Sequence, residues 1–322
     1  QAEDGIRDRL VTGVQTCALP ICRGDLKSGL IQSNNIHDLK WNTFRCDGSR
    51  DINQITAEDV FGPNGFLKNV HPNFESRPNQ AKYAAMSEET LTQVKGVGVA
   101  EAGTGLGKSM AYLFGAFKNS LNIEEAGPTV VACHTKHLQD QLFYKDLPQL
   151  AETLDVPIKA VMMKGRNNYI CKTRFDWLIS DAKTLDGLDV EALIPVLFWM
   201  QWTKTGDLSE CSGFFNARRI WLKSTFCSEP GFCTGEVCNR HDGCYYGKLK
   251  KAIFRAHIIV VNHSLLMTDA AQPGFLPDFN SVIVDEAHNL VKSAYAQFKT
   301  EWNEQGTSYL LQTVDPDRKS VV

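Results

Sequence analysis

The segment Ala102-Gly103-Thr104-Gly105-Leu106-Gly107-Lys108-Ser109 decides the fold that we expect for this chain. The apolar run Val97–Ala100 before it predicts a strand, and the residues from Lys108 to Phe117 predict a helix. A glycine-rich turn between a strand and a helix directs backbone N–H groups and the positive end of the helix at phosphate groups. Lys108 adds a full positive charge, and the Ser109 hydroxyl is placed to ligate Mg²⁺. The segment therefore predicts a nucleotide-binding α/β domain.

A second motif, Asp285-Glu286-Ala287-His288, follows the apolar run Ser281–Val284. A buried strand that ends on two acids places both carboxylates at the carboxyl edge of a sheet, where ligands bind. We expect Asp285 to hold Mg²⁺ and Glu286 to orient or deprotonate the attacking water. The candidate catalytic residues are Lys108, Asp285, Glu286 and His288. Together the two motifs predict ATP hydrolysis.

The composition is that of an ordinary globular protein. The 322 residues are 43% hydrophobic and 22% charged, with a net charge of −3. The length is enough for roughly two domains, and no apolar run is long enough to span a membrane. Because no overall basic excess exists, binding of nucleic acid requires a local basic groove.

Ten cysteines stand in a chain without secretory features, which favours a metal or cluster site over a disulfide scaffold. Three lie close together in a Gly-rich stretch and a fourth lies upstream; the four are Cys171, Cys233, Cys238 and Cys244. Gaps wider than two residues between the cysteines favour an iron–sulfur cluster, with a zinc site as the alternative. Cys211 and Cys227 are rival ligands, while Cys133 is expected to be a small buried residue.

Both ends of the sequence differ from the rest. Residues 1–22 and 317–322 resemble translated sequencing-adapter sequence, and we expect neither segment to be part of the native fold; a disordered native tail is the alternative. A signal peptide is not expected, because acidic residues stand at the start and the apolar stretches there are short.

As a set, these motifs resemble those of the DinG branch of the XPD-like superfamily 2 DNA helicases, a family that carries a 4Fe–4S cluster. Phe74–Gln80 resembles the family's Q motif, in which the glutamine reads the adenine edge. Lys164–Cys171 resembles the KGRxNYxC segment with the first cluster ligand, and Val260–Leu266 resembles the strand before the second motif. The resemblance covers roughly residues 55–290.

The resemblance implies ATP, Mg²⁺ and a 4Fe–4S cluster as cofactors. The implied ATP-binding residues are Arg77, Gln80, Gly103, Thr104, Gly105, Gly107, Lys108 and Ser109. The implied metal ligands are Ser109 and Asp285 for Mg²⁺, and Cys171, Cys233, Cys238 and Cys244 for the cluster. Thr135 and Lys136, which follow the expected strand Thr129–Cys133, are candidate contacts to DNA phosphates.

The implied fold is a RecA-like P-loop NTPase domain, with a parallel sheet flanked by helices and an inserted cysteine-rich iron–sulfur domain. We expect residues 55–163 and 245–290 in the RecA-like domain, 164–244 in the insertion, and 291–316 at the start of an arch-like helical insertion. The chain is expected to be truncated before the second RecA-like domain, which supplies the arginine finger in the family.

The implied activity is that of an ATP-dependent DNA helicase that translocates 5′ to 3′. Its partners would be single-stranded DNA and duplex/single-strand junctions, in the bacterial cytoplasm at the nucleoid and without a membrane. Because the closing half of the ATP site is expected to be missing, this chain alone should bind ATP and DNA weakly without unwinding duplex.

Two further segments bear on DNA binding. Leu188–Trp202 is expected to be partly helical and to form a small core, with stacking on bases as the alternative. Basic residues flank the first and last cluster cysteines, and they form a basic rim if the fold brings them together, with solvated faces as the alternative. These residues are Lys164, Arg166, Lys172, Arg174, Lys248, Lys250, Lys251 and Arg255.

Two other functions stay open on the sequence. One is a P-loop ATPase that is not a helicase and whose cysteines bind structural zinc. The other is a nucleotide-binding module without catalysis.

Overall fold

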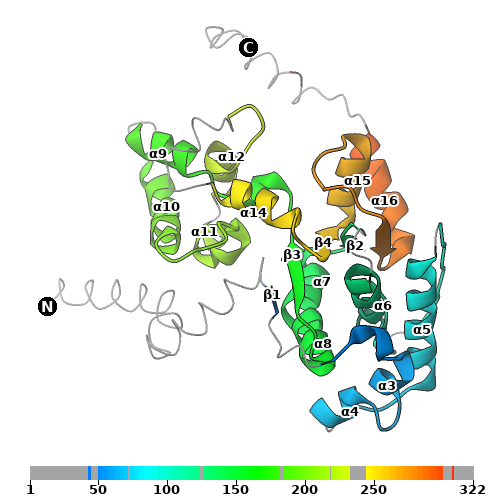
Figure 1. Ribbon diagram of the computed structural model, residues 1–322. Helices are drawn as coiled ribbons and strands as arrows, with labels where there is room; N and C mark the ends of the chain where they lie inside the picture. The colour runs from blue at the N-terminus through cyan, green and yellow to red at the C-terminus, as the bar shows by residue number, and fades with distance from the viewer. Residues whose placement is uncertain are drawn as a thin grey trace, which may run out of the picture.

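The structure is a computed structural model that describes residues 43–44, 50–71, 73–93, 95–103, 105–122, 127–181, 185–217, 219–232, 244–299 and 307. A sheet of order β1-β3-β4-β2-β5 forms its centre (Figure 1). The strands are β1 (Thr43–Phe44), β2 (Thr129–Cys133), β3 (Ile158–Met162), β4 (Ile258–Asn262) and β5 (Ser281–Val284). β3, β4, β2 and β5 run parallel, whereas β1 is antiparallel to β3. This α/β architecture is consistent with the expected RecA-like domain.

Helices connect and cover the parallel strands, as crossover connections require. They are α3 (Ala57–Phe61), α4 (Phe66–Val70), α5 (Pro78–Thr92), α6 (Lys108–Asn122), α7 (Lys136–Gln141), α8 (Leu147–Leu154), α14 (Tyr245–Ile253), α15 (His263–Ala271) and α16 (Leu290–Phe298). A π-helical turn, Leu142–Asp146, joins α7 to α8, and 3₁₀ turns span Ile52–Gln54 and Ala287–Asn289. No helix in the described residues is both long enough and apolar enough to cross a membrane.

The central strands contribute to two apolar layers, one on each face of the sheet. Val131 and Cys133 of β2 lie in the layer with α6 and α8, while Val130 and Ala132 lie in the layer with α14 and α15. Because successive strand residues point to opposite faces, a continuous apolar run fills both layers. The run Thr129–Cys133 is buried throughout, as expected for a central strand.

A third apolar cluster lies within residues 170–245, between β3 and α14. The helices there are α9 (Lys172–Ser180), α10 (Gly187–Met200), α11 (Ser212–Asn216) and α12 (Lys223–Phe226), with 3₁₀ turns at Arg166–Asn168, Leu208–Glu210 and Ile220–Leu222. The rings of Phe214 and Phe226 meet edge to face at its centre, 5.3 Å apart. The segment inserted into the sheet domain therefore has a small core of its own (Figure 1).

The stretch Leu188–Trp202 is helical as expected, but only one face of α10 lies in this core. Leu193 and Val196 are buried, whereas Phe198 and Trp202 are 62% and 53% exposed. The expectation that the large aromatic residues pack inside is wrong for these two. A helix in a core this small is covered on one side only.

The strand expected at Val97–Ala100 is not formed. Val97 and Val99 are 89% and 88% exposed. A strand depends on hydrogen bonds to a neighbour and on burial of its side chains, and among the described residues this segment has neither. The helix expected after the glycine-rich loop is formed as α6. Of the expected helical segment 291–316, residues 291–299 and 307 are described; α16 covers those up to Phe298, and the rest of the segment lies outside the described residues.

Candidate nucleotide-binding site

The two motifs meet at the carboxyl edge of the sheet. Lys108 is the first residue of α6, and Asp285 and Glu286 follow β5 directly. The Lys108 ammonium donates to Glu286, with Nζ 2.9 Å from Oε1. One turn further along α6, the Tyr112 hydroxyl donates to Asp285, with 3.2 Å between Oη and Oδ2. One helix therefore contacts both acids of the second motif.

The two carboxylates differ in protonation chemistry. Burial raises the pKa of Asp285; the hydrogen bond from Tyr112 opposes this rise and the charge of Glu286 adds to it. The hydrogen bond from Lys108 lowers the pKa of Glu286 and, in return, raises the pKa of Lys108. Glu286 is thus held as an anion, while Asp285 binds a proton more readily than a solvated aspartate.

The glycine-rich loop follows a path that requires glycine at two positions. Gly105 and Gly107 have φ of 82° and 81°, in the left-handed region. A Cβ on Gly107 would collide with the side chain of Gln80, whose Nε2 donates to the Gly107 carbonyl at 3.0 Å. The amide of Gln80 is thus directed at the phosphate loop, and its predicted contact to adenine stays a prediction. Thr104 lies outside the described residues.

Arg77 and Gly103 complete the predicted ATP-binding set. An ideal Cβ on Gly105 would have the Arg77 Nη1 atom 4.0 Å away, which places the guanidinium beside the loop. Arg77 also pairs weakly with Glu75, at 3.7 Å between Nη2 and Oε2. Nothing described lies within 4 Å of a Cβ built on Gly103, so this side of the loop is open.

Ser109 lies beside the second acid motif. Burial raises the pKa values of Tyr112 and Asp146, and hydrogen bonding with Ser109 opposes both shifts. Ser109 and Asp285 therefore both contact the Tyr112 side chain. A hydroxyl and a carboxylate that converge in this way are oxygen ligands of the kind that Mg²⁺ prefers.

Two residues of this site are not predicted from the sequence. One is Tyr112, and its spacing of one turn from Lys108 is the signal that could have identified it. The other is His263, which is fully buried at the start of α15, with Nε2 2.9 Å from the Asp285 carbonyl oxygen. Burial lowers the pKa of His263, so the neutral ring donates through Nε2 and holds the backbone of the acid motif.

The histidine of the second motif, His288, is exposed. His288 has 70% of its side chain accessible, with Nδ1 3.5 Å from Glu286 Oε2. Glu286 itself has a left-handed backbone, with φ of 53°. A non-glycine residue in this region costs of order 1–3 kcal/mol and is most often retained at functional sites. The local fold thus turns the Glu286 carboxylate away from the path of the strand and toward Lys108.

The candidate DNA contacts lie at the same edge of the sheet. The Thr135 side chain caps α7 by accepting from the Leu138 N–H at 3.2 Å. Lys136 Nζ donates to Asn168 Oδ1 at 2.9 Å, and Lys223 Nζ of the insertion lies 3.5 Å from that same oxygen. Two ammonium groups therefore converge on one uncharged acceptor. Burial lowers the pKa of Lys223, and the charge of Lys136 lowers it further.

Five of the eight basic residues predicted around the cluster cysteines have local partners among the described residues, and acidic partners neutralise two of these five. Lys164 is buried between Asp140 and Asp207, at 3.0 and 3.1 Å. Arg174 pairs with Glu229 at 2.6 Å. The others with partners are Arg166 over the Tyr246 ring, Lys172 over the Tyr245 ring, and Lys250 bonded to the carbonyls of Gly274 and Phe275.

The cysteines named in the sequence analysis differ in where they lie. Cys171 and Cys244 are the residues directly before α9 and α14, whereas the predicted ligands Cys233 and Cys238 lie outside the described residues. Cys211 and Cys227 lie in the apolar core of the insertion, and burial raises the pKa of both thiols. Cys171 is buried to a similar extent, so burial does not distinguish these rival ligands from the predicted one. Cys133 is fully buried at the end of β2, as expected.

The described part of the chain contains no group of three or more His, Cys, Asp or Glu side chains arranged to hold a metal ion. Because two of the four predicted cluster ligands lie outside it, the cluster stays a prediction. The Mg²⁺ assignment to Ser109 and Asp285 also stays a prediction.

The chain is similar in sequence to the bacterial proteins YoaA and DinG. The chain is 34% identical over 251 residues to the ATP-dependent DNA helicase YoaA of Haemophilus influenzae, covering 76% of this chain and 38% of that protein. YoaA of Escherichia coli is 31% identical over 248 residues, covering 74% of this chain and 37% of that protein. The 3′-5′ exonuclease DinG of Bacillus subtilis is 25% identical over 230 residues, 71% of this chain and 24% of that protein. No protein-family model matches the sequence. The chain thus spans well under half of the length of these relatives.

Proposed function

The matched part of this chain belongs to the family of DinG-type DNA helicases, and we propose that the chain is the ATP-binding portion of an ATP-dependent helicase that moves 5′ to 3′ along single-stranded DNA. The observation that carries the proposal is the convergence of Lys108 and Tyr112 of α6 on Glu286 and Asp285 after β5. Residues 55–163 and 245–290 make the RecA-like domain and residues 164–244 its iron–sulfur insertion. The protein acts on DNA, including duplex/single-strand junctions, in the bacterial cytoplasm.

The chemistry of the site divides among four side chains. Bound ATP would supply the phosphoryl group, and Mg²⁺ would supply the cation that neutralises its charge. Ser109 and Asp285 would hold the metal, because both present oxygen atoms beside Tyr112. Lys108 would leave Glu286 and donate its hydrogen bonds to the phosphates of ATP instead. Glu286, held as an anion, then takes the proton of the attacking water at Oε1 or Oε2.

DNA phosphates bind where Lys136 and Lys223 converge. This proposal is supported by two positive charges that share one uncharged acceptor, since both ammonium groups lie within reach of the amide oxygen of Asn168. A phosphate beside them supplies the negative charge that the amide lacks. Because Lys136 belongs to the sheet domain and Lys223 to the insertion, a bound strand contacts both parts.

The cysteine site holds a 4Fe–4S cluster on Cys171, Cys233, Cys238 and Cys244. Iron and acid-labile sulfide, measured on the chain purified without oxygen, should each reach about four per chain. Cys171→Ser should remove them, whereas Cys211→Ala, a change in the apolar core, is the matched control and should retain them. Zinc in their place would favour the ATPase with a structural zinc site.

The test of the function itself is binding of a fluorescent ATP analogue and of an oligothymidylate by the purified chain. Lys108→Ala should weaken the nucleotide by roughly 10- to 100-fold, the range expected for losing a charged hydrogen-bond donor. Lys82→Ala, an exposed lysine of α5, is the control. Equal nucleotide binding by both variants would refute the assignment of the ATP site, and efficient duplex unwinding by this chain alone would refute its role as a portion of the machine.

A further inference from the structure

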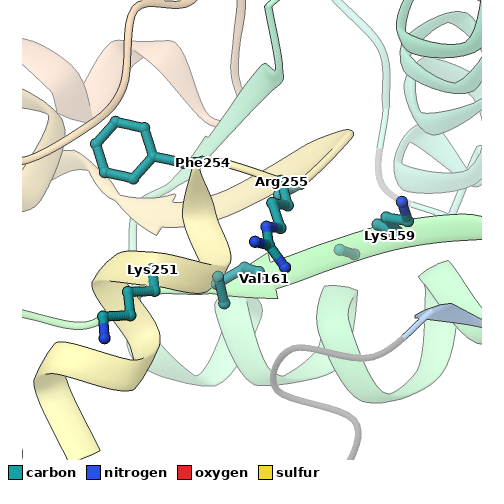
Figure 2. Close-up of a pocket in the computed structure, with 8 residues that line it drawn as sticks. Lys159, Val161, Lys251, Phe254 and Arg255 are labelled. Atoms are coloured by element: carbon teal, nitrogen blue, oxygen red, sulfur yellow. The ribbon is translucent and has the colours of Figure 1, made fainter.

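A hollow of about 660 Å³ lies at the β3 side of the sheet, away from the nucleotide motifs. Its floor is apolar, from Ala160, Val161, Ala252 and Ala256, and its other lining residues are Lys159, Lys251, Phe254 and Arg255. We call these eight residues the basic hollow. Figure 2 shows Lys251 and Arg255 beside Val161 of β3, with Lys159 further along the same strand and Phe254 extending from the end of α14.

The basic hollow carries three positive charges and no acidic residue in its lining. Lys159, Lys251 and Arg255 are exposed, and none of them has a hydrogen-bonded or ionic partner from its side chain within the described ranges. This distinguishes Lys251 and Arg255 from the neighbouring Lys250, which donates to two backbone carbonyls. Two of the eight basic residues predicted around the cluster, Lys251 and Arg255, thus line this hollow.

The nearby histidine of the described residues adds no charge to the hollow. His257, next to the hollow, accepts the Lys159 N–H at Nδ1 over 3.2 Å. Burial lowers the pKa of His257, and the charge of Lys159 lowers it further, so the ring is neutral at this position. Three cations without an ionic partner among the described residues, over an apolar floor, fit a ligand that combines a polyanionic backbone with flat apolar groups.

The hollow and the nucleotide site lie at opposite ends of the parallel strands. Phe254–Ala256 precede β4, and Lys159 is near the start of β3, whereas Asp285 and Lys136 follow the ends of β5 and β2. The Lys136–Lys223 pair therefore belongs to a different edge of the sheet. A ligand in the basic hollow does not compete with ATP.

We propose that the basic hollow is a second binding site for single-stranded nucleic acid, with backbone phosphates on Lys159, Lys251 and Arg255 and a base stacked on the exposed ring of Phe254. The ring is 67% exposed, as a stacking platform must be. The inference rests on the proposed function insofar as the chain handles DNA, but it assigns residues that the site at the carboxyl edge does not use.

The test measures binding of a fluorescein-labelled oligothymidylate of about 20 nucleotides, by anisotropy, over a range of salt concentrations. Lys251→Glu with Arg255→Glu should weaken binding roughly tenfold or more and reduce the salt slope by roughly 0.7 for each phosphate that is no longer neutralised. Lys82→Glu with Lys292→Glu, which changes the charge equally at exposed sites on α5 and α16, should leave binding near wild type.

A second variant separates stacking from charge. Phe254→Ala should weaken the single strand roughly tenfold with the salt slope unchanged, and Phe254→Trp should restore affinity. Blunt duplex of the same length should be insensitive to Phe254→Ala. A duplex that loses affinity equally would overturn the single-strand assignment.

The same assay distinguishes this site from the proposed function. Loss of affinity in Lys136→Ala but not in the Lys251/Arg255 variant would overturn the second site and leave the function intact. Loss in the Lys251/Arg255 variant, in both the wild-type and Lys136→Ala backgrounds, supports a separate site. Absence of oligonucleotide binding by the wild-type chain, with ATP binding retained, would overturn both DNA assignments.

Discussion

Lys108 Nζ lies 2.9 Å from Glu286 Oε1, although 178 positions separate the two residues in the sequence. This ion pair joins the first residue of α6 to the residue after Asp285, so the lysine proposed to bind phosphate and the glutamate proposed to activate water are partners. Because both side chains are about one-third accessible, the pair is easily exchanged for another ion. Glu286 therefore competes with the phosphates of a bound nucleotide for Lys108 in the proposed site.

This competition predicts the effect of Glu286→Gln on nucleotide binding. Removing the carboxylate charge releases Lys108 to the phosphates, so the Kd for a fluorescent ATP analogue should fall, by up to roughly fivefold, the range for a partly exposed ion pair. Turnover, measured in a longer protein that has it, should be lost. Weaker nucleotide binding by Glu286→Gln would contradict the idea of competition.

The raised pKa of Asp285 predicts a pH dependence of Mg²⁺ binding. A protonated carboxyl does not ligate a cation, so Mg²⁺-dependent nucleotide binding should decline as the pH falls through the raised pKa of Asp285, before Glu286 takes up a proton. Tyr112→Phe removes a hydrogen bond that lowers this pKa, and the decline should then begin at higher pH. A titration that is identical in wild type and Tyr112→Phe would exclude this coupling.

The buried lysine of the insertion predicts a large stability effect. Lys164→Ala leaves the fully buried Asp207 without its cation, and breaking such a pair typically costs about 3–5 kcal/mol. Urea denaturation followed by circular dichroism measures the loss, with the exposed Lys82→Ala as a control. The neutral pair Lys164→Met with Asp207→Asn should recover part of it, because the fully buried residue then carries no charge; the loss of the Asp140 ion pair, to a half-exposed carboxylate, remains. A cost below about 1 kcal/mol for Lys164→Ala, the level of a surface ion pair, would contradict the assignment.

Two glycines of the phosphate loop offer a matched comparison. Gly107→Ala forces a side chain into the left-handed region and into Gln80, so it should lower the free energy of unfolding by about 1–2 kcal/mol or more. Gly103→Ala has open space around its Cβ and should be close to neutral in the same denaturation experiment. Equal effects of both substitutions would argue against this geometry of the loop.

Local sequence signals predicted the elements whose causes are local. The strands Thr129–Cys133 and Ser281–Val284 and the helix that begins at Lys108 followed from apolar runs, glycine placement and helix periodicity. The burial predicted for both strands is confirmed for Thr129–Cys133 but is wrong for Ser281–Val284, which lies at the end of the described sheet and has Val282 43% exposed. The acid pair at the end of a strand predicted the edge of the sheet where Asp285 and Glu286 lie. The chemistry of the nucleotide site could thus be anticipated, whereas the partner of each side chain could not.

Other expectations failed because they depended on distant residues. Val97–Ala100 has a strand composition, but a strand also needs a hydrogen-bonded neighbour, and none of the described strands pairs with it. For the basic residues around the cysteines the sequence left a basic rim and solvated faces open, and it did not reveal that Asp140, Asp207 and Glu229 neutralise two of them. Spacing along the chain does not reveal which acids fold against which bases.

The sequence by itself determined a P-loop α/β domain, its acid motif and the residues that carry its charge, because these depend on residue type and short spacing. Tertiary structure alone decided that Tyr112 and His263 hold Asp285, that Lys164 is buried in an ion-pair cluster, and that Lys159, Lys251 and Arg255 remain exposed around one hollow. The physical reason is that charge, hydrogen bonding and burial act between atoms that are close in space, and folding brings together residues that are far apart in the chain.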